Sequence, residues 1–234
     1  MINRYENRIA VYTAIFGDYD KVLDPRVWPR NIDYYMISDK YYPSRVWRQK
    51  DISKFINIIK DFSPQMKNRF FKMHPHLLFP DYKYTIYVDG NRVIKGDFNG
   101  YIPLIGEYGL ATYHHNRRDC TFDECTAVVD QGKDSMESVL RHIEFLEAEG
   151  MPRHYGLPFC HVLARRKCQM ADRIMKMWWE EYTRYSRRDQ ISFPHVLYEL
   201  GIPVSKVATL GKPVGGDRFI YEQVHKHMKA DKLK

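Results

Sequence analysis

The amino-acid sequence predicts an α/β fold with a mostly parallel central sheet flanked by helices. Short apolar runs rich in β-branched and aromatic residues alternate with segments of helical periodicity, an order that favours a parallel sheet. Strands are expected at 9–16, 33–39 and 84–88, and each reaches an acidic turn. Ligands of open α/β sheets bind beyond the carboxyl ends of the strands, so a site is expected at these turns.

Length and composition favour one domain that covers residues 1–234. The hydrophobic content of 44% is sufficient for a core, and no apolar run approaches the ~20 residues of a membrane helix. Residues 1–8 are polar and contain no apolar signal segment, so we expect a cytoplasmic protein. Its four cysteines show neither a C-x-x-C pair nor zinc-like spacing, which predicts reduced thiols.

The formal charge of +8 favours an anionic partner. Nucleic acid, a nucleotide diphosphate and an acidic membrane surface all satisfy this charge, which does not choose among them. The basic tail at 225–234 suggests a possible peripheral contact with an anionic membrane.

The first half of the chain also contains a helix that carries cationic side chains. Ser63 and Pro64 form a helix start, and Pro75 should end or kink the helix. Arg69 and Lys72 lie three residues apart on one face, and His76 follows one turn later if the kink at Pro75 allows it. Cationic groups on one face suit a diphosphate, although a solvated basic face explains them too.

The second half predicts strands at 109–113 and 159–163 and three helices. Asp134 and Glu137 have capping-box spacing at the start of a helix that Gly150 ends. The next helices are expected at 171–185 and from Asp189 to Leu200. The helix between Asp134 and Gly150 is expected to bury an apolar stripe, which consists of Met136, Val139, Leu140, Ile143 and Leu146.

The turn Asp89-Gly90-Asn91 follows a buried strand and offers oxygen ligands. A carboxylate and an amide suit a divalent cation such as Mg²⁺ or Mn²⁺, which would in turn hold a diphosphate. An ordinary polar turn is the alternative interpretation. The sequence contains no G-x-G-x-x-G after the first strand, no Walker lysine loop, no G-x-S-x-G and no H-E-x-x-H, so it does not favour the enzyme classes that these motifs indicate.

Five segments in order give the chain a resemblance to a known family. They are T-A-I-F-G-D-Y-D at 13–20, R-F-F-K-M-H-P-H at 69–76, Y-V-D-G-N at 87–91, H-N-R-R-D-C at 115–120 and R-D-Q-I-S-F at 188–193. The chain resembles nucleotide-sugar glycosyltransferases of the GT-A type, and more closely a plant and bacterial glycosyltransferase-like family. The turn departs from the Asp-x-Asp of many such enzymes because it reads Asp-Gly-Asn.

The resemblance implies a single Rossmann-like GT-A domain that binds a nucleotide-diphosphate sugar. It places the base and ribose against Thr13, Ala14 and Asp18, with Asp39 accepting from a base N–H or a ribose hydroxyl. Arg69, Lys72 and His76 would hold the diphosphate. Asp89 and Asn91 would bind manganese or magnesium, which would stabilise the leaving diphosphate.

Further roles are implied for residues in the second half of the chain. His115 and Arg118 would touch the donor sugar or the acceptor, and Lys212 would close over the phosphates. Asp189 and Gln190 would contact the sugar, or Asp189 would act as general base on the acceptor hydroxyl. A simple N-cap is the alternative for Asp189, and a helix-start carboxylate is the alternative for Glu124.

The predicted function is therefore sugar transfer to a glycan or lipid-linked acceptor, as in polysaccharide biosynthesis. The alternatives are a basic nucleic-acid-binding module without catalysis and an inactive nucleotide-binding relative. The aromatic residues sit in apolar runs and helix stripes, as core residues do, and no nucleic-acid motif is present, so no nucleic-acid partner is expected.

Overall fold

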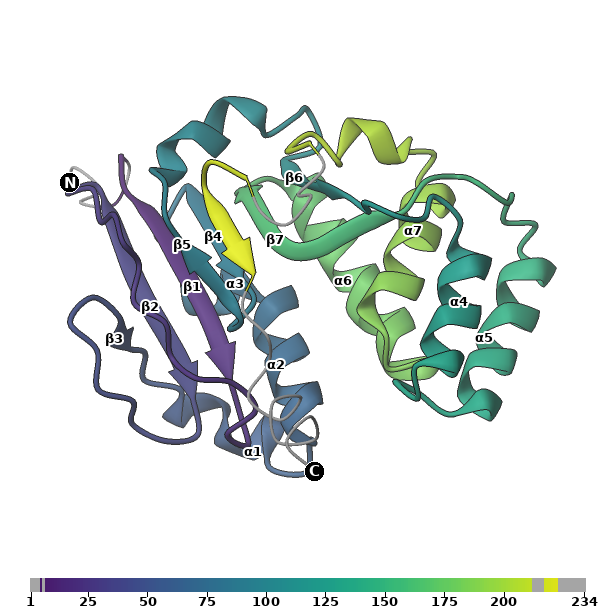
Figure 1. Cartoon of the computed structure of the whole chain (residues 1–234), viewed down its shortest axis with the longest axis horizontal. Coiled ribbons are helices and arrows are strands. Elements are labelled where there is room, and N and C mark those ends of the chain that lie inside the picture. Colours follow the sequence, from purple (N-terminus) through teal and green to yellow (C-terminus); the bar gives the residue numbers. More distant parts are fainter. Residues whose placement is uncertain (1–4, 6, 212–216, 223–234) are drawn as a thin grey trace.

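A computed structural model describes residues 5, 7–211 and 217–222. A six-stranded sheet forms its centre, with the strand order β3-β2-β1-β4-β7-β6 (Figure 1). A two-stranded sheet, β5-β8, lies beside it. The strands are β1 (Ile9–Ile15), β2 (Ile32–Ser38), β3 (Arg48–Gln49), β4 (Tyr84–Val88), β5 (Arg92–Ile94), β6 (Leu110–His114), β7 (Pro158–Arg166) and β8 (Ile220–Glu222).

The mostly parallel sheet is confirmed, with one strand reversed. β1 pairs in parallel with β2 and β4, and β2 pairs in parallel with β3. β7 runs antiparallel to both of its neighbours, β4 and β6. β6 therefore points the same way as β4, and both strands end toward the same edge of the sheet.

Helices cover one face of this sheet and irregular structure covers the other. α2 (Pro64–Met73), α6 (Gln169–Arg184) and α7 (Asp189–Glu199) pack together on the first face, where Tyr12 of β1 points (Figure 1). Val11 points to the opposite face, toward Phe98 and Ile220. β1 is therefore buried on both faces, as its unbroken apolar run predicts. The second face is covered by the 3₁₀ segment η2 (Phe98–Leu104) and by the β5–β8 pair.

Shorter elements lie between the longer helices and strands. They are η1 (Ser53–Phe55), α1 (Ile56–Ile59), α3 (Pro75–Leu78) and η3 (Val204–Lys206). α2 ends at Met73 and α3 begins at Pro75, so the expected break at this proline is confirmed.

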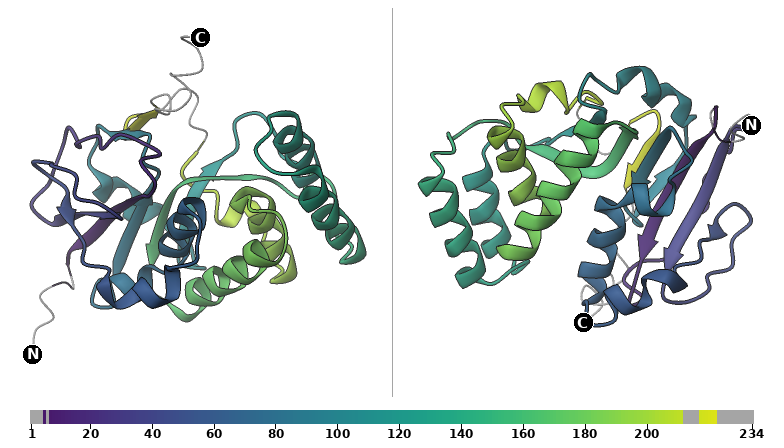
Figure 2. Two further views of the ribbon diagram at one scale, coloured as in Figure 1. Left: turned by 90° about the horizontal axis from the view of Figure 1, so that it is seen from below. Right: turned by 180° about the vertical axis from the view of Figure 1, so that it is seen from behind.

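A third apolar cluster joins α4 (Thr121–Asp130) and α5 (Met136–Ala148) to α7. These two helices stand on the side of α7 remote from β1 (Figure 2). The stripe expected for α5 is partly wrong, because Met136 and Leu140 are 56% and 47% exposed. His142 is buried in their place beside Val139 and Leu146.

The capping residue predicted for α5 is also wrong. The side chain of Ser135, not Asp134, caps the helix by accepting from Ser138 N. Asp134 Oδ2 instead accepts hydrogen bonds from Ser186 Oγ and Arg187 N, which lie between α6 and α7.

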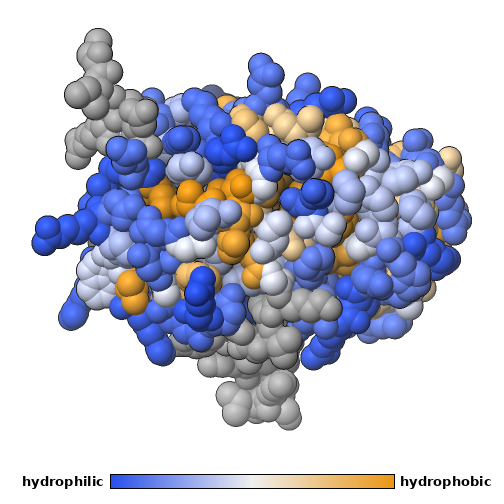
Figure 3. All heavy atoms as spheres, turned by 90° about the horizontal axis from the view of Figure 1, so that it is seen from above, coloured by the Kyte–Doolittle hydropathy of each residue, from blue (hydrophilic) through white to orange (hydrophobic). Residues whose placement is uncertain are grey.

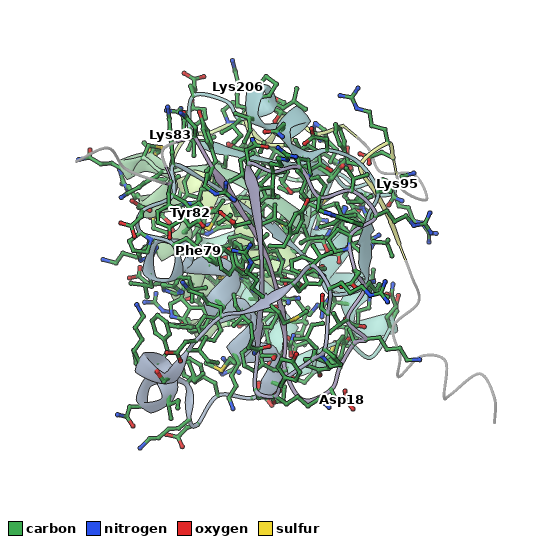
Figure 4. All side chains as sticks on the ribbon, turned by 90° about the vertical axis from the view of Figure 1, so that its left-hand side faces the viewer. Asp18, Phe79, Tyr82, Lys83, Lys95 and Lys206 are labelled. Atoms are coloured by element: carbon green, nitrogen blue, oxygen red, sulfur yellow. The ribbon has the colours of Figure 1, made fainter. Side chains whose placement is uncertain are left out.

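The carboxyl end of β1 meets the start of α2. Gly17 has φ 63°, and a Cβ there would lie 2.8 Å from Cγ of Pro64, so the turn fits only glycine. Asp18 lies in this turn, near the bottom of the molecule in Figure 4, whereas Lys83, which precedes β4, lies near the top. The two ends of the parallel strands are thus well separated.

The surface of the molecule carries both polar and apolar side chains (Figure 3). On the face shown in Figure 3, apolar side chains form a broken band between polar flanks. No helix of the described residues is long and apolar enough to cross a membrane. Cys120, Cys125, Cys160 and Cys168 are all free thiols, as their spacing predicts. Lys212 and the tail at 225–234 lie outside the described residues.

Candidate functional site

The turn at the end of β4 is fixed by its backbone and packed tightly against β1. Asp89 N donates to His161 O of β7 at 2.8 Å, and Arg92 N donates to Asp89 O at 3.0 Å. A Cβ on Gly90 would lie 3.0 Å from Ile15 and 3.3 Å from Oδ2 of Asp20. The Asp89 side chain is 28% exposed, so its carboxylate is accessible to a ligand.

A buried group of charges lies next to this turn; we call Arg69, Lys72 and Asp189 the Lys72 cluster. Lys72 Nζ donates to Asp189 Oδ2 at 2.6 Å and lies 3.8 Å from Asp89 Oδ1. Arg69 Nε lies 3.0 Å from the same Oδ2 of Asp189. The Lys72 side chain is 1% exposed and approaches the rings of Tyr87 and Trp178. α2 and α7 are thus joined by ion pairs at the carboxyl ends of the strands.

The Asp189 carboxylate remains ionised in this setting. Burial alone would raise its pKa, but Arg69, Lys72 and Arg188 hold the pKa of Asp189 well below its usual range. Such a carboxylate stays negatively charged and is a weak base. The simple N-cap alternative is wrong, because Arg188 occupies the N-cap position and Asp189 begins α7.

Asn68 and Tyr87 also belong to the site, although no role was predicted for either residue. Asn68 Nδ2 donates to Ala14 O at 2.6 Å and to the Tyr87 hydroxyl at 3.1 Å. Arg69 Nη1 donates to Asn68 Oδ1. Asn68 thereby connects β1, β4 and the Lys72 cluster. One signal was available, because Asn68 lies four residues before Lys72 on the same helix.

The turns after β1 and β2 contact each other through polar groups. Gly17 N donates to Asp39 Oδ2 at 2.9 Å. Asp18, whose φ is 57°, accepts from Lys40 Nζ at 2.9 Å and from the Tyr42 hydroxyl at 3.3 Å. These contacts bring Asp18 and Asp39 together, as their positions after neighbouring strands predict.

Two further groups at the site lack a hydrogen-bond partner among the described residues. Thr13 Oγ1 is buried and faces a void of about 10 Å³ that Asp89 and Gly90 also line. The Gln190 side-chain nitrogen, next to Asp189, is likewise buried without an acceptor. Buried polar groups are normally satisfied, so both are candidates for a ligand or a water molecule.

His76 does not join Arg69 and Lys72, contrary to the expected convergence. The break at Pro75 turns the chain into α3, and the His76 ring packs against His74 at 5.6 Å. Burial and the charge of Arg165 lower the pKa of His76. Arg165 pairs with Thr85 near the start of β4, so His76 faces the amino end of the sheet.

His115 and Arg118 lie apart from the Lys72 cluster, beyond the end of β6. Both line a hollow that is described below. Arg118 donates to Glu124 Oε2 through Nε at 2.7 Å and Nη2 at 2.6 Å, so Glu124 is an ion-pair partner as well as a first-turn residue of α4.

The oxygen ligands at the turn suit a divalent cation only in part. No three His, Cys, Asp or Glu side chains of the described residues are grouped as a metal site. Asp89 and Asn91 offer a carboxylate and an amide from one turn, with the Asp20 carboxylate against Gly90. Hard oxygen donors of this kind fit Mg²⁺ or Mn²⁺ when phosphate oxygens and waters supply the remaining positions.

The comparison with protein families decides the identity. Residues 2–212 match the sequence model of the TOD1/MUCI70 glycosyltransferase-like domain. The chain belongs to this family. A curated relative, the probable hexosyltransferase MUCI70 of Arabidopsis thaliana, is 22% identical over 243 residues. The match covers 93% of this chain and 42% of that protein, so the chain spans less than half of the relative's length.

The chain was also compared in three dimensions with solved structures of glycosyltransferases. The bifunctional glycosyltransferase WbbM in its apo form has a TM-score of 0.52 and 13% identity, over 85% of this chain and 38% of that one. Mouse xyloside xylosyltransferase 1, also apo, has a TM-score of 0.46 and 8% identity, over 83% of this chain and 82% of that one. The likeness to WbbM supports the assignment of the mixed sheet flanked by helices as a GT-A fold, as the resemblance predicts.

Proposed function

We propose that this domain transfers a sugar from a nucleotide-diphosphate donor to a glycan or lipid-linked acceptor. The observation that carries the proposal is the Lys72 cluster, which sets two cations and a permanently ionised carboxylate beside Asp89. These groups lie at the carboxyl ends of the strands, where α/β folds bind ligands. Membership of a glycosyltransferase-like family supports the same reaction.

The nucleoside part of the donor would bind at the turns after β1 and β2. Thr13 and Ala14 lie near the carboxyl end of β1, which is buried throughout, and Asp18 and Asp39 present carboxylates in the turns that follow β1 and β2. Carboxylates accept from ribose hydroxyls and base N–H groups. Thr13 Oγ1 is buried without a hydrogen-bond partner among the described residues, which is consistent with a polar ligand group at this end of the strand.

The diphosphate would lie between Asp89 and the cations of Arg69 and Lys72. Carboxylates at this edge are at least as numerous as cations, so a diphosphate adds negative charge that the protein alone does not offset. A divalent cation held by Asp89 and Asn91 would supply that charge and would act as a Lewis acid toward the leaving diphosphate. The carboxylates are Asp18, Asp20, Asp39, Asp89 and Asp189, and the cations are Lys40, Arg69, Lys72 and Arg188.

Asp189 and Gln190 would position the sugar. Among the described contacts, both cations meet Oδ2 of Asp189, which leaves Oδ1 to accept from a sugar hydroxyl. The buried Gln190 nitrogen would donate to a second sugar oxygen. As the bond between the anomeric carbon and the diphosphate oxygen breaks, positive charge develops on the sugar ring, and the ionised Asp189 stabilises it. This role replaces that of general base, which its low pKa disfavours.

The test is a thermal-shift panel of UDP-, GDP-, dTDP- and CMP-sugars, each with and without Mn²⁺. A ligand at a hundred times its Kd adds about 2.7 kcal/mol, which for a domain of this size raises Tm by about 5–10 °C. We expect a metal-dependent rise with one nucleotide. Asp89→Ala should remove the dependence on metal and lower transfer by about 10²–10³-fold.

An exposed acidic residue supplies the matched control. Asp61→Asn, on the loop before α2, should leave both the shift and the transfer rate unchanged. A rise of Tm without metal would assign the phosphate to Arg69 and Lys72 alone. A flat panel, or an Asp89→Ala protein that transfers sugar at the wild-type rate, would overturn the proposal and direct attention to oligonucleotide binding.

A further inference from the structure

A hollow of about 570 Å³ lies beyond the carboxyl end of β6, outside the Lys72 cluster. Its volume falls within the range of about 300–1,000 Å³ that is typical of small-molecule pockets. Three segments form its walls: the chain that leaves β6 (114–119), the chain that enters β7 (154–157), and the start of η3 (203–205). A Cβ on Gly156 would lie 2.8 Å from Cβ of Val204, so two of the walls are in close contact.

A short series of contacts connects the hollow with the turn at Asp89. The His115 ring, in the hollow, packs edge-on against Phe159 at 5.2 Å. The Arg92 guanidinium lies 5.5 Å from the centre of the Phe159 ring, and Arg92 N bonds to Asp89 O. Between Leu157, in the hollow, and His161, which holds the Asp89 turn, β7 covers about 13 Å at ~3.3 Å per residue. A ligand that occupies both places must therefore be longer than one sugar ring.

Hydrogen-bonding groups in the hollow are held in fixed states. His115 Nδ1 accepts from Arg118 N at 2.9 Å and from Arg117 N at 3.3 Å. Burial and the nearby Arg118 lower the pKa of His115 to about 4, so at neutral pH the ring is uncharged and its proton resides on Nε2. Arg118 is fixed by Glu124. The hollow thus presents oriented donors.

Acceptors and apolar surface are interleaved with these donors. Asp119 Oδ1 lies 2.8 Å from His154 Nδ1, and this contact raises the pKa of His154. Glu124 neutralises the charge of Arg118, and the other positive and negative side chains that line the hollow nearly balance. The hollow is therefore polar but has little net charge. Alternating donors and acceptors suit hydroxyl groups, each of which donates and accepts. The remaining lining includes Asn116, Ser205, Tyr155, Pro203 and Val204.

We propose that this hollow is a remote subsite for an oligosaccharide acceptor, which holds a sugar residue distant from the one that receives the transferred unit. The inference rests on the proposed function and narrows its acceptor to a glycan of several residues. A polar, nearly neutral hollow does not suit a lipid chain. Binding energy from a remote residue would favour elongated acceptors over single sugars.

The test measures binding of saccharides to the whole chain by saturation-transfer NMR. The probes are β-1,4-linked gluco-, xylo-, manno- and galacto-oligosaccharides, each from the monosaccharide to the pentasaccharide. We expect at least one series in which affinity rises sharply once the chain exceeds a threshold length. Ser205→Trp, which fills the hollow from an exposed position, should remove that rise. Asn116→Ala with Arg117→Ala should weaken the long probes by about tenfold, as expected for two lost hydrogen bonds.

Neighbouring residues provide matched controls. Lys206→Trp places the same ring one residue away, outside the lining, and Arg141→Ala removes an exposed arginine of α5. Both should bind every probe as the wild type does. Equal binding of short and long probes, binding of none, or an unchanged Ser205→Trp protein would each overturn the subsite.

Nucleotide-sugar binding separates this proposal from the proposed function. Ser205→Trp should retain the full thermal shift with the donor that stabilises the wild type, because the donor edge is untouched. If that shift is present in all variants and the length dependence is absent, the subsite fails and the proposed function stands. If no nucleotide sugar shifts the wild type, the proposed function fails whatever the saccharides do.

Discussion

Two buried ionic clusters join helices in this protein, and they differ in what their carboxylates face. In one, Glu181 of α6 meets His142 of α5 through Oε1 at 2.9 Å and His195 of α7 through Oε2 at 2.7 Å. Each oxygen has a partner, and all three side chains are buried. In the other, Asp189 meets Arg69 and Lys72 through one oxygen, beside the partly exposed Asp89.

The difference shows how similar charges serve different purposes. The Glu181 cluster is closed, so a ligand could enter it only by displacing a protein partner. The Lys72 cluster lies at the carboxyl ends of the strands and includes a lysine shared between two carboxylates. Buried ion pairs contribute little net stability unless their remaining hydrogen-bonding capacity is used. A buried pair at a sheet edge, in which both cations meet the same carboxylate oxygen, is therefore better explained by a ligand than by stability alone.

Removal of Lys72 should have the largest effect on folding. Lys72→Met leaves Asp189 buried with Arg69 alone, and breaking a buried pair from one side costs about 3–5 kcal/mol. Urea unfolding measures the loss. The double variant Lys72→Met with Asp189→Leu should recover only part of the loss, because it removes the unpaired Asp189 charge but leaves Arg69 without its carboxylate partner.

An exposed pair serves as the control for Lys72. Lys176→Met in α6 removes a lysine that is 76% exposed and lies 3.9 Å from Glu180, and it should change the unfolding free energy by no more than about 0.5 kcal/mol. A Lys72→Met protein as stable as this control would show that the cluster is not needed for folding.

Asp189→Asn should separate the two roles considered for Asp189. The amide keeps the shape and loses the charge, so we expect the nucleotide-dependent thermal shift to remain and the transfer rate to fall by about 10²-fold. Because the pKa of Asp189 lies well below its usual range, the carboxylate stays ionised as pH falls through 5. The wild-type rate should show no acid limb from Asp189 above that pH. A limb that Asp189→Asn abolishes would restore the general-base role.

The Glu181 cluster predicts a smaller, pH-dependent effect on stability. Burial is the largest single influence and opposes the charge on His195, but the hydrogen bond to Glu181 and the negative charges of Glu181, Glu199 and Glu149 together raise the pKa of His195. A raised pKa means that the folded state binds the proton more tightly. The stabilisation is complete below the unfolded pKa of about 6.5 and disappears as pH rises through the folded pKa.

Unfolding in urea at several pH values measures this linkage. His195→Gln should be less stable than the wild type below pH 6.5, with a difference that narrows at higher pH. His154→Gln is the exposed comparison: Asp119 also raises the pKa of His154, but the His154 side chain is 63% exposed, so this variant should show a smaller change of the same sign. A constant difference between His195→Gln and the wild type across pH would contradict the linkage.

The sequence was sufficient to predict β1, β2, β4, β6 and β7 and the edge at which β1, β2 and β4 end, but not the short strands β3, β5 and β8. Apolar β-branched runs followed by Asp or Gly are local signals, and they placed Asp18, Asp39 and Asp89 at the correct ends. The pairing of Lys72 with Asp189 spans 117 residues, and no local pattern encodes it. The reversal of β7 was also not predicted, because its apolar run reads the same in either direction.

The remaining errors arose where local rules allowed two answers. Helical spacing placed His76 one turn after Lys72, but Pro75 redirected the chain into α3. His142 replaced two apolar residues in the buried stripe of α5 because Glu181 satisfies its ring nitrogen. Polar residues can thus occupy a core position when a distant partner is present, and single-sequence periodicity does not reveal that partner.

The cap of α5 gives the smallest effect and tests the correction of Asp134 directly. Ser135→Ala removes the hydrogen bond that Ser135 Oγ accepts from Ser138 N and should cost about 1 kcal/mol in urea unfolding. It should leave transfer unchanged, because α5 is remote from Asp89. Asp134→Ala instead frees Ser186 and Arg187, three and two residues before Asp189. We expect it to lower transfer at saturating donor as well as stability. If the two variants change the transfer rate and the unfolding free energy equally, Asp134 acts only at the start of the helix. The contacts of Asp134 with Ser186 and Arg187 would then have no effect on the function of Asp189.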